Sequence, residues 1–170
     1  MSTTPLPNPL RILFVCLGNI CRSPSAEGVF RKQLEQAQLL HLVEVDSAGT
    51  ASYHIGEPAD RRAEDAAARR GIDISAHRAR QIHRKDFDTY HLIVAMDKSN
   101  LATLKRLCPA EHQHKLRLMM SFAPETGIEE VPDPYYGDDR DFEYVLDLLE
   151  KACQGLLEWL RQHYLIQQPN

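Results

Sequence analysis

The feature that most constrains the fold of this 170-residue chain is the alternation of short apolar segments with longer amphipathic ones. The first segment, RILFV at 11–15, lacks the polar alternation of a strand with one wet face, and so predicts a strand buried on both faces. Further strands are predicted at 43–48, 92–96 and, more weakly, 116–120. Strands that alternate with helices indicate a parallel sheet covered by helices on both faces.

Helix signals fill the segments between these strands. We expect Ser23 to cap the first helix and Pro24 to open it, and Gly71 to close the second. The helices are predicted at 24–39, 60–70 and 98–107, with a last helix that starts between 138 and 141 and carries apolar residues at helical spacing to 160. Acidic residues at that last start suit the positive end of a helix.

The chain length suits one domain, which we place at residues 10–162. Three prolines and no apolar periodicity predict a flexible N-terminal tail over 1–9, and 163–170 are assigned to a C-terminal tail. The apolar run 12–17 is far shorter than the roughly 20 residues of a membrane span. We therefore expect a cytoplasmic protein with no membrane partner, a monomer with a weak dimer as the alternative. A net charge of −4 without a long basic run argues against nucleic acid.

The loop after the first predicted strand carries the densest chemistry. In open parallel sheets, ligands bind beyond the carboxyl ends of the strands. A short loop that leaves a strand and enters a helix aims several backbone N–H groups at one point, and the helix dipole adds positive potential. The sequence therefore predicts a phosphate-binding loop, whose members are Leu17, Gly18, Asn19, Ile20, Cys21, Arg22 and Ser23.

Cys16 stands at the mouth of this predicted anion site. The positive field favours the thiolate form, which is the nucleophile that a phosphorus centre needs. The planar fork of Arg22 can hold two phosphate oxygens at once, and the Ser23 hydroxyl can donate to the sulfur and help it leave. These groups stabilise charge without a metal, so we expect a cysteine-dependent phosphatase that needs no cofactor.

The segment CLGNICRSP at 16–24 resembles the signature of the low-molecular-weight protein tyrosine phosphatases. Stretches DSAGT at 46–50, AHRARQ at 76–81, AMDKSN at 95–100 and DPYYG at 133–137 resemble the same family in consistent order. The resemblance implies a flavodoxin-like three-layer α/β sandwich, with a four-stranded parallel sheet and a Cys-x5-Arg loop between the first strand and the first helix. It also implies hydrolysis of phosphotyrosine and small aryl phosphates through a phosphocysteine on Cys16. Tyrosine-phosphorylated proteins and inorganic phosphate or other oxyanions are the expected partners.

The resemblance assigns the general acid to Asp133. An Asp-Pro pair in a loop is otherwise an ordinary turn, but the reaction demands an acid because a tyrosine phenolate, with a pKa of about 10, leaves slowly without a proton. The supporting residues implied by the family are Asn19, Ser23, Ser47 and His77. Its substrate cleft maps to Ile20, Tyr53, Tyr135 and Tyr136; at the position of Tyr53 eukaryotic relatives often have Trp. Asp97 is expected to cap or hold the helix that follows it, without a catalytic role.

Cys21 lies five residues from Cys16 in the same curled loop, and we predict that it is a redox partner of the nucleophile. The alternative is that Cys21 only packs under the loop. No metal site is expected, because the four cysteines include no C-x-x-C pair and His112 and His114 suit a charged surface loop. The acidic residues at 138–141 lack the EF-hand pattern.

Three other functions fit parts of the pattern. A thiol-dependent arsenate reductase would need a redox-active cysteine pair on a short flexible segment, and Cys108 and Cys153 do not provide one. A phosphoarginine phosphatase of the same family tends to carry Thr at the position of Ile20. A non-enzymatic phosphate-binding module would not need Cys16 and Asp133 together.

Overall fold

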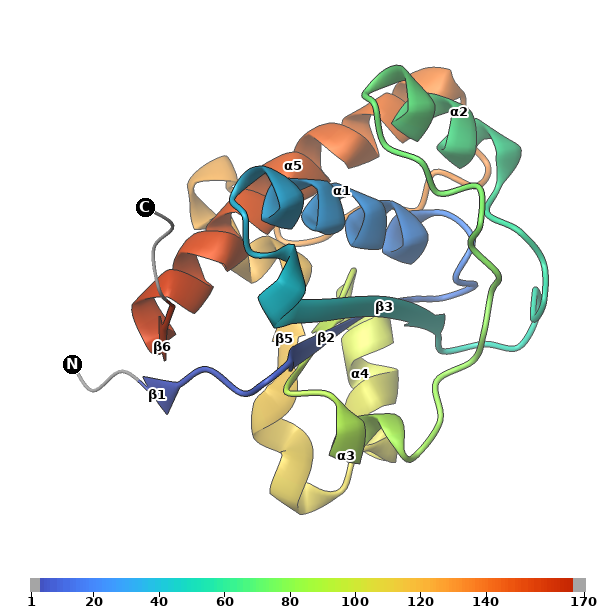
Figure 1. Ribbon diagram of the computed structural model, residues 1–170. Coiled ribbons are helices and arrows are strands. Elements are labelled where there is room, and N and C mark those ends of the chain that lie inside the picture. Colours follow the sequence, from blue (N-terminus) through green and yellow to red (C-terminus); the bar gives the residue numbers. More distant parts are fainter. Residues whose placement is uncertain (1–3, 167–170) are drawn as a thin grey trace.

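The computed structural model describes residues 4–166 of the chain. A sheet of four parallel strands, in the order β3-β2-β4-β5, forms its centre (Figure 1). The strands are β2 (Leu10–Cys16), β3 (Val43–Gly49), β4 (Leu92–Ala95) and β5 (Leu116–Leu118). The predicted four-stranded parallel sheet is therefore confirmed.

Helices cover both faces of this sheet and complete three layers (Figure 1). One face carries α1 (Arg22–Gln36), α2 (Arg61–Arg69) and α5 (Asp139–His163), and the other carries α3 (Asp86–Thr89) and α4 (Lys98–Leu107). Short 3-10 turns connect the elements: η1 (Leu40–Leu42), η2 (Ala110–Lys115), η3 (Met119–Phe122) and η4 (Pro124–Thr126). No helix between residues 4 and 166 is long and apolar enough to cross a membrane.

The central strand β2 is buried on both faces, as its apolar sequence predicts. Ile12 and Phe14 point into the larger core, formed with α1, α2 and α5, whereas Leu13 and Val15 point into the smaller core beneath α4. Each such side chain contributes about 1.5–3 kcal/mol to folding when it is fully buried. Pairing with β3 on one side and β4 on the other fixes the carboxyl end of β2 at Cys16.

The first helix begins earlier than the sequence predicts. α1 starts at Arg22, and Cys21 before it makes no side-chain capping bond. Ser23 was expected to be the N-cap, but it lies in the first turn, where its hydroxyl contacts the side chains of Cys16 and Asn19 instead. The helix also ends at Gln36, because the chain turns back through a residue with φ of 60° at Gln38.

The ends of α2 and α5 follow their sequence signals. Asp60 caps α2 by accepting a hydrogen bond from the backbone of Arg62, and Gly71 follows the helix with φ of 75°. Asp138 and Asp141 form a reciprocal capping box at the start of α5. These acidic residues therefore serve the helix start, in agreement with the sequence prediction.

Parts of both expected tails contact the folded domain. β1 (Thr4–Pro5) pairs in parallel with β6 (Tyr164–Leu165), and Leu6 packs against the larger core with Ile166. These contacts hold residues 4–6 and 164–166 of the predicted tails, 1–9 and 163–170, against the domain. The remainder of the expected tails, 1–3 and 167–170, lies outside the described residues.

The fourth strand is shorter than its predicted span of 116–120. It ends at Leu118, and η3 then turns Met119 and Met120 into the larger core. This turn brings the carbonyl oxygen of Phe122 close to α5: a Cβ atom added to Gly155 would lie 1.7 Å from it. The helix can therefore pack here only because residue 155 has no side chain.

We predict that Gly155→Ala destabilises the protein. Alanine improves intrinsic helix propensity by about 0.8–1.0 kcal/mol, but a backbone oxygen at 1.7 Å forces α5 or η3 to move, which costs about 1–3 kcal/mol or more. Urea unfolding should show the net loss. The exposed neighbour Gln154→Ala is the control and should change stability by less than about 0.5 kcal/mol; equal stabilisation by both changes would contradict the packing argument.

Candidate active site

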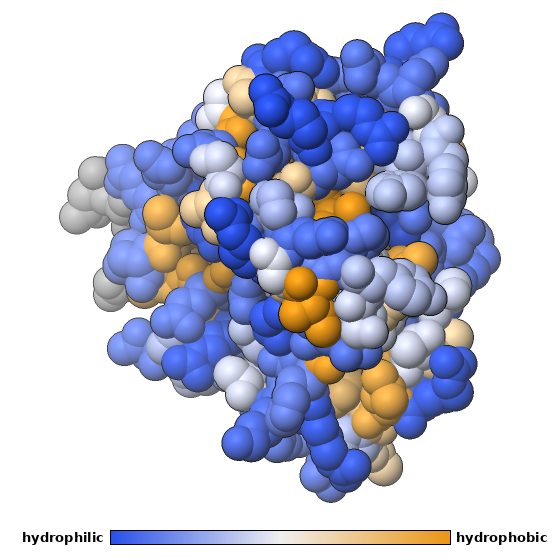
Figure 2. All heavy atoms as spheres, turned by 90° about the vertical axis from the view of Figure 1, so that its right-hand side faces the viewer, coloured by the Kyte–Doolittle hydropathy of each residue, from blue (hydrophilic) through white to orange (hydrophobic). Residues whose placement is uncertain are grey.

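A cleft of about 240 Å³ opens beyond the carboxyl end of β2. β3 points to the right in Figure 1, and Figure 2 looks onto that end, where small hydrophobic areas lie within a mostly hydrophilic surface. Three segments far apart in the sequence line the cleft. Its residues are Cys16, Leu17, Gly18, Ile20, Cys21, Arg22, Tyr53, His54, Asp133, Tyr135 and Tyr136.

The sulfur of Cys16 lies at the floor of this cleft and is almost fully buried. The backbone N–H of Asn19 donates to Sγ at 3.3 Å, and the hydroxyl oxygen of Ser23 lies 3.0 Å from it. An anionic sulfur can only accept hydrogen bonds, so the Ser23 hydroxyl then acts as the donor. Two donors and the N-terminus of α1 thus surround the sulfur and favour negative charge there.

Asn19 connects the loop to its surroundings. Its backbone is left-handed, with φ of 58°, and its side chain is completely buried. The side-chain Nδ2 donates to the hydroxyls of Ser23 and Ser47, at 2.8 and 3.0 Å, and Oδ1 accepts from the backbone N–H of Arg80 at 2.9 Å. The Asn19 carbonyl lies 2.7 Å from Nε2 of His77. All four residues expected to support the loop therefore meet at this point.

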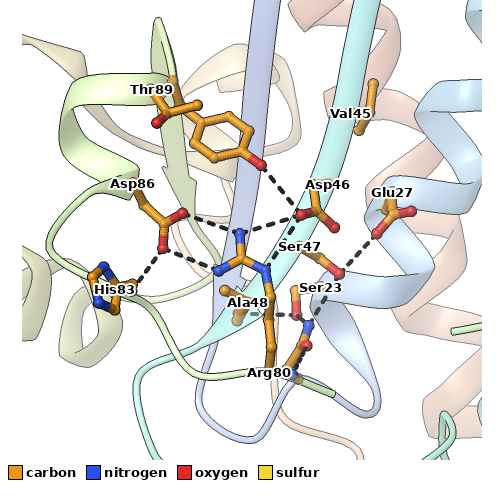
Figure 3. Close-up of polar contacts among 12 residues, drawn as sticks. Ser23, Glu27, Val45, Asp46, Ser47, Ala48, Arg80, His83, Asp86 and Thr89 are labelled. Atoms are coloured by element: carbon orange, nitrogen blue, oxygen red, sulfur yellow. Dashed lines mark hydrogen bonds and ion pairs between the residues drawn. The ribbon is translucent and has the colours of Figure 1, made fainter. Parts of the chain in front are cut away.

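Two further groups stand behind the loop that the sequence analysis did not identify. Ser47 donates to Oε1 of Glu27 at 2.8 Å, which orients the Ser47 hydroxyl from the side of α1 (Figure 3). The Arg80 side chain lies between the carboxylates of Asp46 and Asp86, with nitrogen–oxygen distances of 3.0–3.3 Å (Figure 3). The segment 76–81 carried a family resemblance, but no spacing rule pairs residues 34 positions apart.

These charge pairs hold the backbone that contacts Asn19. The carbonyl of Arg80 accepts from the N–H of Gly49 at 2.8 Å, and the N–H of Ile82 donates to Gly49 in return. A Cβ atom at Gly49 would lie 2.7 Å from the carbonyl oxygen of Leu17, so the close approach of the two loops requires glycine. The end of β3 therefore lies between the predicted phosphate-binding loop and the segment around Arg80.

Arg22 is buried beneath the cleft and is held by three distant groups. Its Nη1 donates to Oδ2 of Asp97 at 2.6 Å and to the carbonyl of Val131 at 3.0 Å, while Nη2 lies 3.6 Å from Oδ2 of Asp133. Burial by itself would lower the pKa of Arg22, but the negative charge of Cys16 and the hydrogen bond to Asp97 outweigh it and raise the pKa. The guanidinium is therefore charged and fixed in direction.

Asp97 has two roles. Its Oδ1 accepts from the backbone N–H of Asn100 at 2.7 Å, which confirms the predicted cap of α4. Its Oδ2 also orients Arg22, a role that the sequence analysis did not assign. The signal was available in the topology, because β4 lies beside β2 and the carboxyl ends of parallel neighbours meet at one edge.

Asp133 lies at the rim of the cleft, with its side chain 44% exposed. Its Oδ1 accepts from the backbone N–H of Tyr135 at 3.1 Å, which leaves Oδ2 on the side of Arg22. Cys21 lines the same cleft but is buried, and this burial, followed by the charge of Asp60, raises the pKa of its thiol. Cys21 is therefore neutral, and all four cysteines of the chain are free of disulfide bonds.

Aromatic side chains form the walls of the cleft. Tyr53 and Tyr136 are strongly exposed, and the rings of Tyr135 and Tyr136 meet edge to face with centroids 5.0 Å apart. His54 is an additional wall residue that the sequence analysis missed: its ring lies over Gly18, and its Nδ1 is 2.5 Å from Oε2 of Glu57. Ile20 completes the lining near the floor.

No metal cluster accompanies the cleft within residues 4–166: no group of three or more His, Cys, Asp or Glu side chains is placed to hold an ion. His112 lies in η2, where its Nε2 is 2.8 Å from a carboxylate oxygen of Asp88.

Comparisons with known proteins agree with this site. The family model described as low molecular weight phosphotyrosine protein phosphatase matches residues 11–165. A low molecular weight protein-tyrosine-phosphatase of Streptomyces coelicolor is 48% identical over 155 residues, which are 89% of this chain and 94% of the relative. A crystal structure of a protein tyrosine phosphatase from Entamoeba histolytica, with Hepes in the active site, has a TM-score of 0.88 and 40% identity over 90% of this chain and 97% of that one. Vibrio vulnificus Wzb in complex with benzylphosphonate has a TM-score of 0.76 and 33% identity, over 90% of this chain and 98% of that one.

We predict that Asn19→Gly lowers activity although glycine suits the left-handed backbone. The change removes two side-chain donors and one acceptor, each worth about 0.5–1.5 kcal/mol, so kcat/KM for p-nitrophenyl phosphate should fall roughly tenfold or more. The control is Gln38→Gly, which alters another residue of positive φ, exposed and away from the cleft, and should retain full activity. An Asn19→Gly enzyme as active as the control would show that the loop does not need these bonds.

Proposed function

The chain belongs to the low molecular weight phosphotyrosine protein phosphatase family and is a protein tyrosine phosphatase, and we propose that Cys16, Arg22 and Asp133 carry its catalysis. The observation that carries the proposal is the convergence at the Cys16 sulfur of the Asn19 N–H and the Ser23 hydroxyl. A thiolate held in this way, next to a buried arginine, is suited to attack on a phosphate monoester.

In the first step, the Cys16 thiolate attacks phosphorus in line with the leaving oxygen. The S–P bond forms, the bond between phosphorus and the phenolic oxygen breaks, and Asp133 gives its proton to that oxygen. The place of Asp133 at the rim, above the buried sulfur, supports this role. Proton donation matters because the phenolate of tyrosine, with a pKa of about 10, is a poor leaving group.

In the second step, water attacks the phosphocysteine. The Asp133 carboxylate takes a proton from the water, the S–P bond breaks, and inorganic phosphate is released. The Ser23 hydroxyl, 3.0 Å from Sγ, stabilises the thiolate as it leaves. Asp133 and Cys16 thus act in both steps, with opposite directions of proton transfer at the carboxyl group.

Arg22 binds the phosphoryl group through the nitrogens that the protein leaves available. Nη1 is occupied by Asp97 and Val131, whereas within residues 4–166 Nε has no hydrogen bond and Nη2 has only the ion pair with Asp133 at 3.6 Å. A guanidinium can offer such a pair of donors to two phosphate oxygens, and a lysine cannot. The loop N–H groups supply the remaining donors, so charge on the phosphate is neutralised without a metal.

The walls of the cleft support an aromatic phosphate ester as the substrate. Tyr53 and Tyr135 line the same cleft as Cys16, and the ring of a phosphotyrosine can stack on them, which a phosphoserine without a ring cannot do. The benzylphosphonate that the Vibrio vulnificus relative binds likewise combines an aromatic ring with a phosphoryl group. Ile20 near the floor offers no hydrogen bond to a planar guanidinium, which disfavours phosphoarginine. We therefore propose tyrosine-phosphorylated proteins as the substrates.

The other cysteines support a phosphatase rather than a thiol-dependent arsenate reductase. Cys108 lies in the smaller core and Cys153 in the larger one, on opposite faces of the sheet. We propose Cys21 as the redox partner of Cys16, supported by its place in the lining of the same cleft. The need to keep these thiols reduced supports a cytoplasmic location.

Cys16→Ser should abolish turnover and preserve phosphate binding. A serine hydroxyl is not ionised in such a site, but Arg22 and the loop N–H groups remain in place. Hydrolysis of p-nitrophenyl phosphate should fall below about 1% of wild type, a threshold that follows from loss of the nucleophile, while calorimetric titration with inorganic phosphate should still show binding. Turnover above that level would exclude Cys16 as the nucleophile.

Asp133→Asn should slow substrates with poor leaving groups most. General acid catalysis contributes roughly 10²–10⁴-fold, and an activated phenolate needs little of it. We expect kcat/KM to fall much more for phenyl phosphate than for p-nitrophenyl phosphate. The reference is wild type with both substrates; an equal loss on the two would indicate that Asp133 is a structural residue.

A further inference from the structure

The segment that carries Asp133 has no regular structure and is largely exposed. Upstream of the acid, Val131 anchors it: the Val131 N–H donates to the carbonyl of Met96 at 2.9 Å, and its carbonyl accepts from Arg22. These contacts fix the chain on one side of Asp133 only. A general acid on such a segment needs a second anchor to keep its carboxyl group in place.

Arg62, from α2, provides contacts on the other side. Its Nη2 donates to the carbonyl of Tyr135 at 2.9 Å, and its Nη1 donates to the carbonyl of Gly137 at 3.2 Å. The guanidinium also lies over the ring of Phe142, at 4.6 Å from the centroid, and 5.8 Å from that of Tyr135. One cation thus contacts the segment just after Asp133 through both its backbone and an aromatic wall.

Arg62 is itself tied to the phosphate loop. Asp60 accepts from the Arg62 side chain at 3.1 and 2.9 Å, and the backbone N–H of Asp60 donates to the carbonyl of Ile20 at 2.8 Å. Burial alone would raise the pKa of Asp60, but the hydrogen bonds from Arg62 outweigh it and lower the pKa, so both partners are charged. A continuous set of contacts therefore joins Ile20, Asp60 and Arg62 to residues 131–137, the segment that carries Asp133.

We propose that Arg62 is a positioning residue, which fixes Asp133 and the Tyr135 wall relative to the Cys16 loop. It contacts neither the phosphate site nor the reacting atoms, so its effect passes through the backbone of the segment 135–137. The proposal rests on the proposed role of Asp133 as the general acid. Proton transfer requires the acid within hydrogen-bond reach of the leaving oxygen, so a looser segment costs rate where the proton matters.

The test is Arg62→Met, which keeps an unbranched side chain over Phe142 and removes the donors to the two carbonyls. The control is Arg61→Met, one residue away on α2, whose side chain is 86% exposed and contacts Asp65. We measure kcat/KM for phenyl phosphate and for p-nitrophenyl phosphate, because kcat/KM reports the steps up to departure of the phenol. Arg62→Met should lose roughly tenfold more on phenyl phosphate, a part of the 10²–10⁴-fold that a general acid supplies. Arg61→Met should match wild type on both.

Combination with Asp133→Asn separates this inference from the proposed function. If Arg62 acts through the acid, Arg62→Met should add no further discrimination between the two substrates when it is combined with Asp133→Asn. If Asp133→Asn discriminates and Arg62→Met slows both substrates equally, the positioning role is wrong and the acid assignment survives. If Asp133→Asn itself does not discriminate, the acid assignment is wrong and this inference falls with it.

A second variant protects the test against simple misfolding. Arg62→Lys retains the charge and one donating nitrogen in place of the planar fork, and should recover part of the lost rate on phenyl phosphate. Competitive inhibition by vanadate reports the phosphate loop, and we expect it to change less than about twofold in both variants, because Arg62 does not contact that site. A parallel loss of vanadate binding and of activity on both substrates would instead indicate a general structural role, and would overturn the proposal.

Discussion

The site depends first on Asn19, whose side-chain amide is completely buried. A left-handed residue at this position curls the loop so that its own N–H points to the Cys16 sulfur. The side chain is then fully used by Ser23, Ser47 and the backbone of Arg80. An unsatisfied buried amide costs about 1–3 kcal/mol, so this set of bonds forms together or not at all. Contacts within the protein therefore hold the loop in one shape.

Arginines then connect that loop to parts of the chain that are far away in sequence. Arg22 hydrogen-bonds to Asp97, which follows β4, and to the carbonyl of Val131 in the segment that carries Asp133. Arg80 joins β3 to α3 by contacting Asp46 and Asp86. Arg62 joins α2 to the segment before α5 through the carbonyl of Tyr135. The Arg22 guanidinium is buried, and a buried charge is tolerated only when it is paired and hydrogen-bonded, so Arg22 fixes the geometry of its partners. Arg62 and Arg80 are half-buried and hold their partners through several hydrogen bonds each. The contacts of these arginines therefore hold the segments of the cleft together on the hydrophobic core.

Much of this could be predicted from the sequence, and the failures have identifiable causes. The apolar strand before Cys16 indicated the sheet, and the Cys-x5-Arg loop indicated the phosphate site, because both are local patterns. Ser23 was misassigned as a helix cap because Ser-Pro is also the usual opening of a helix, whereas the predicted contact of its hydroxyl with the Cys16 sulfur is present at 3.0 Å. The contact of Arg62 with the Tyr135 carbonyl and that of Asp97 with Arg22 were missed because each pair is more than 70 residues apart in the sequence.

The sequence by itself determined the order of the four central strands and of α1, α2, α4 and α5, and it indicated the proposed nucleophile Cys16 and the loop that surrounds it, since periodicity and the strand–loop–helix pattern act over a few residues. The tertiary structure decided which distant carboxylates and carbonyls meet the arginines, and hence where Asp133 stands. Those contacts follow from the strand order β3-β2-β4-β5, which brings the ends of β2 and β4 to one edge. Such proximity is set by the packing of the whole sheet and its helices, and no local spacing of residues encodes it.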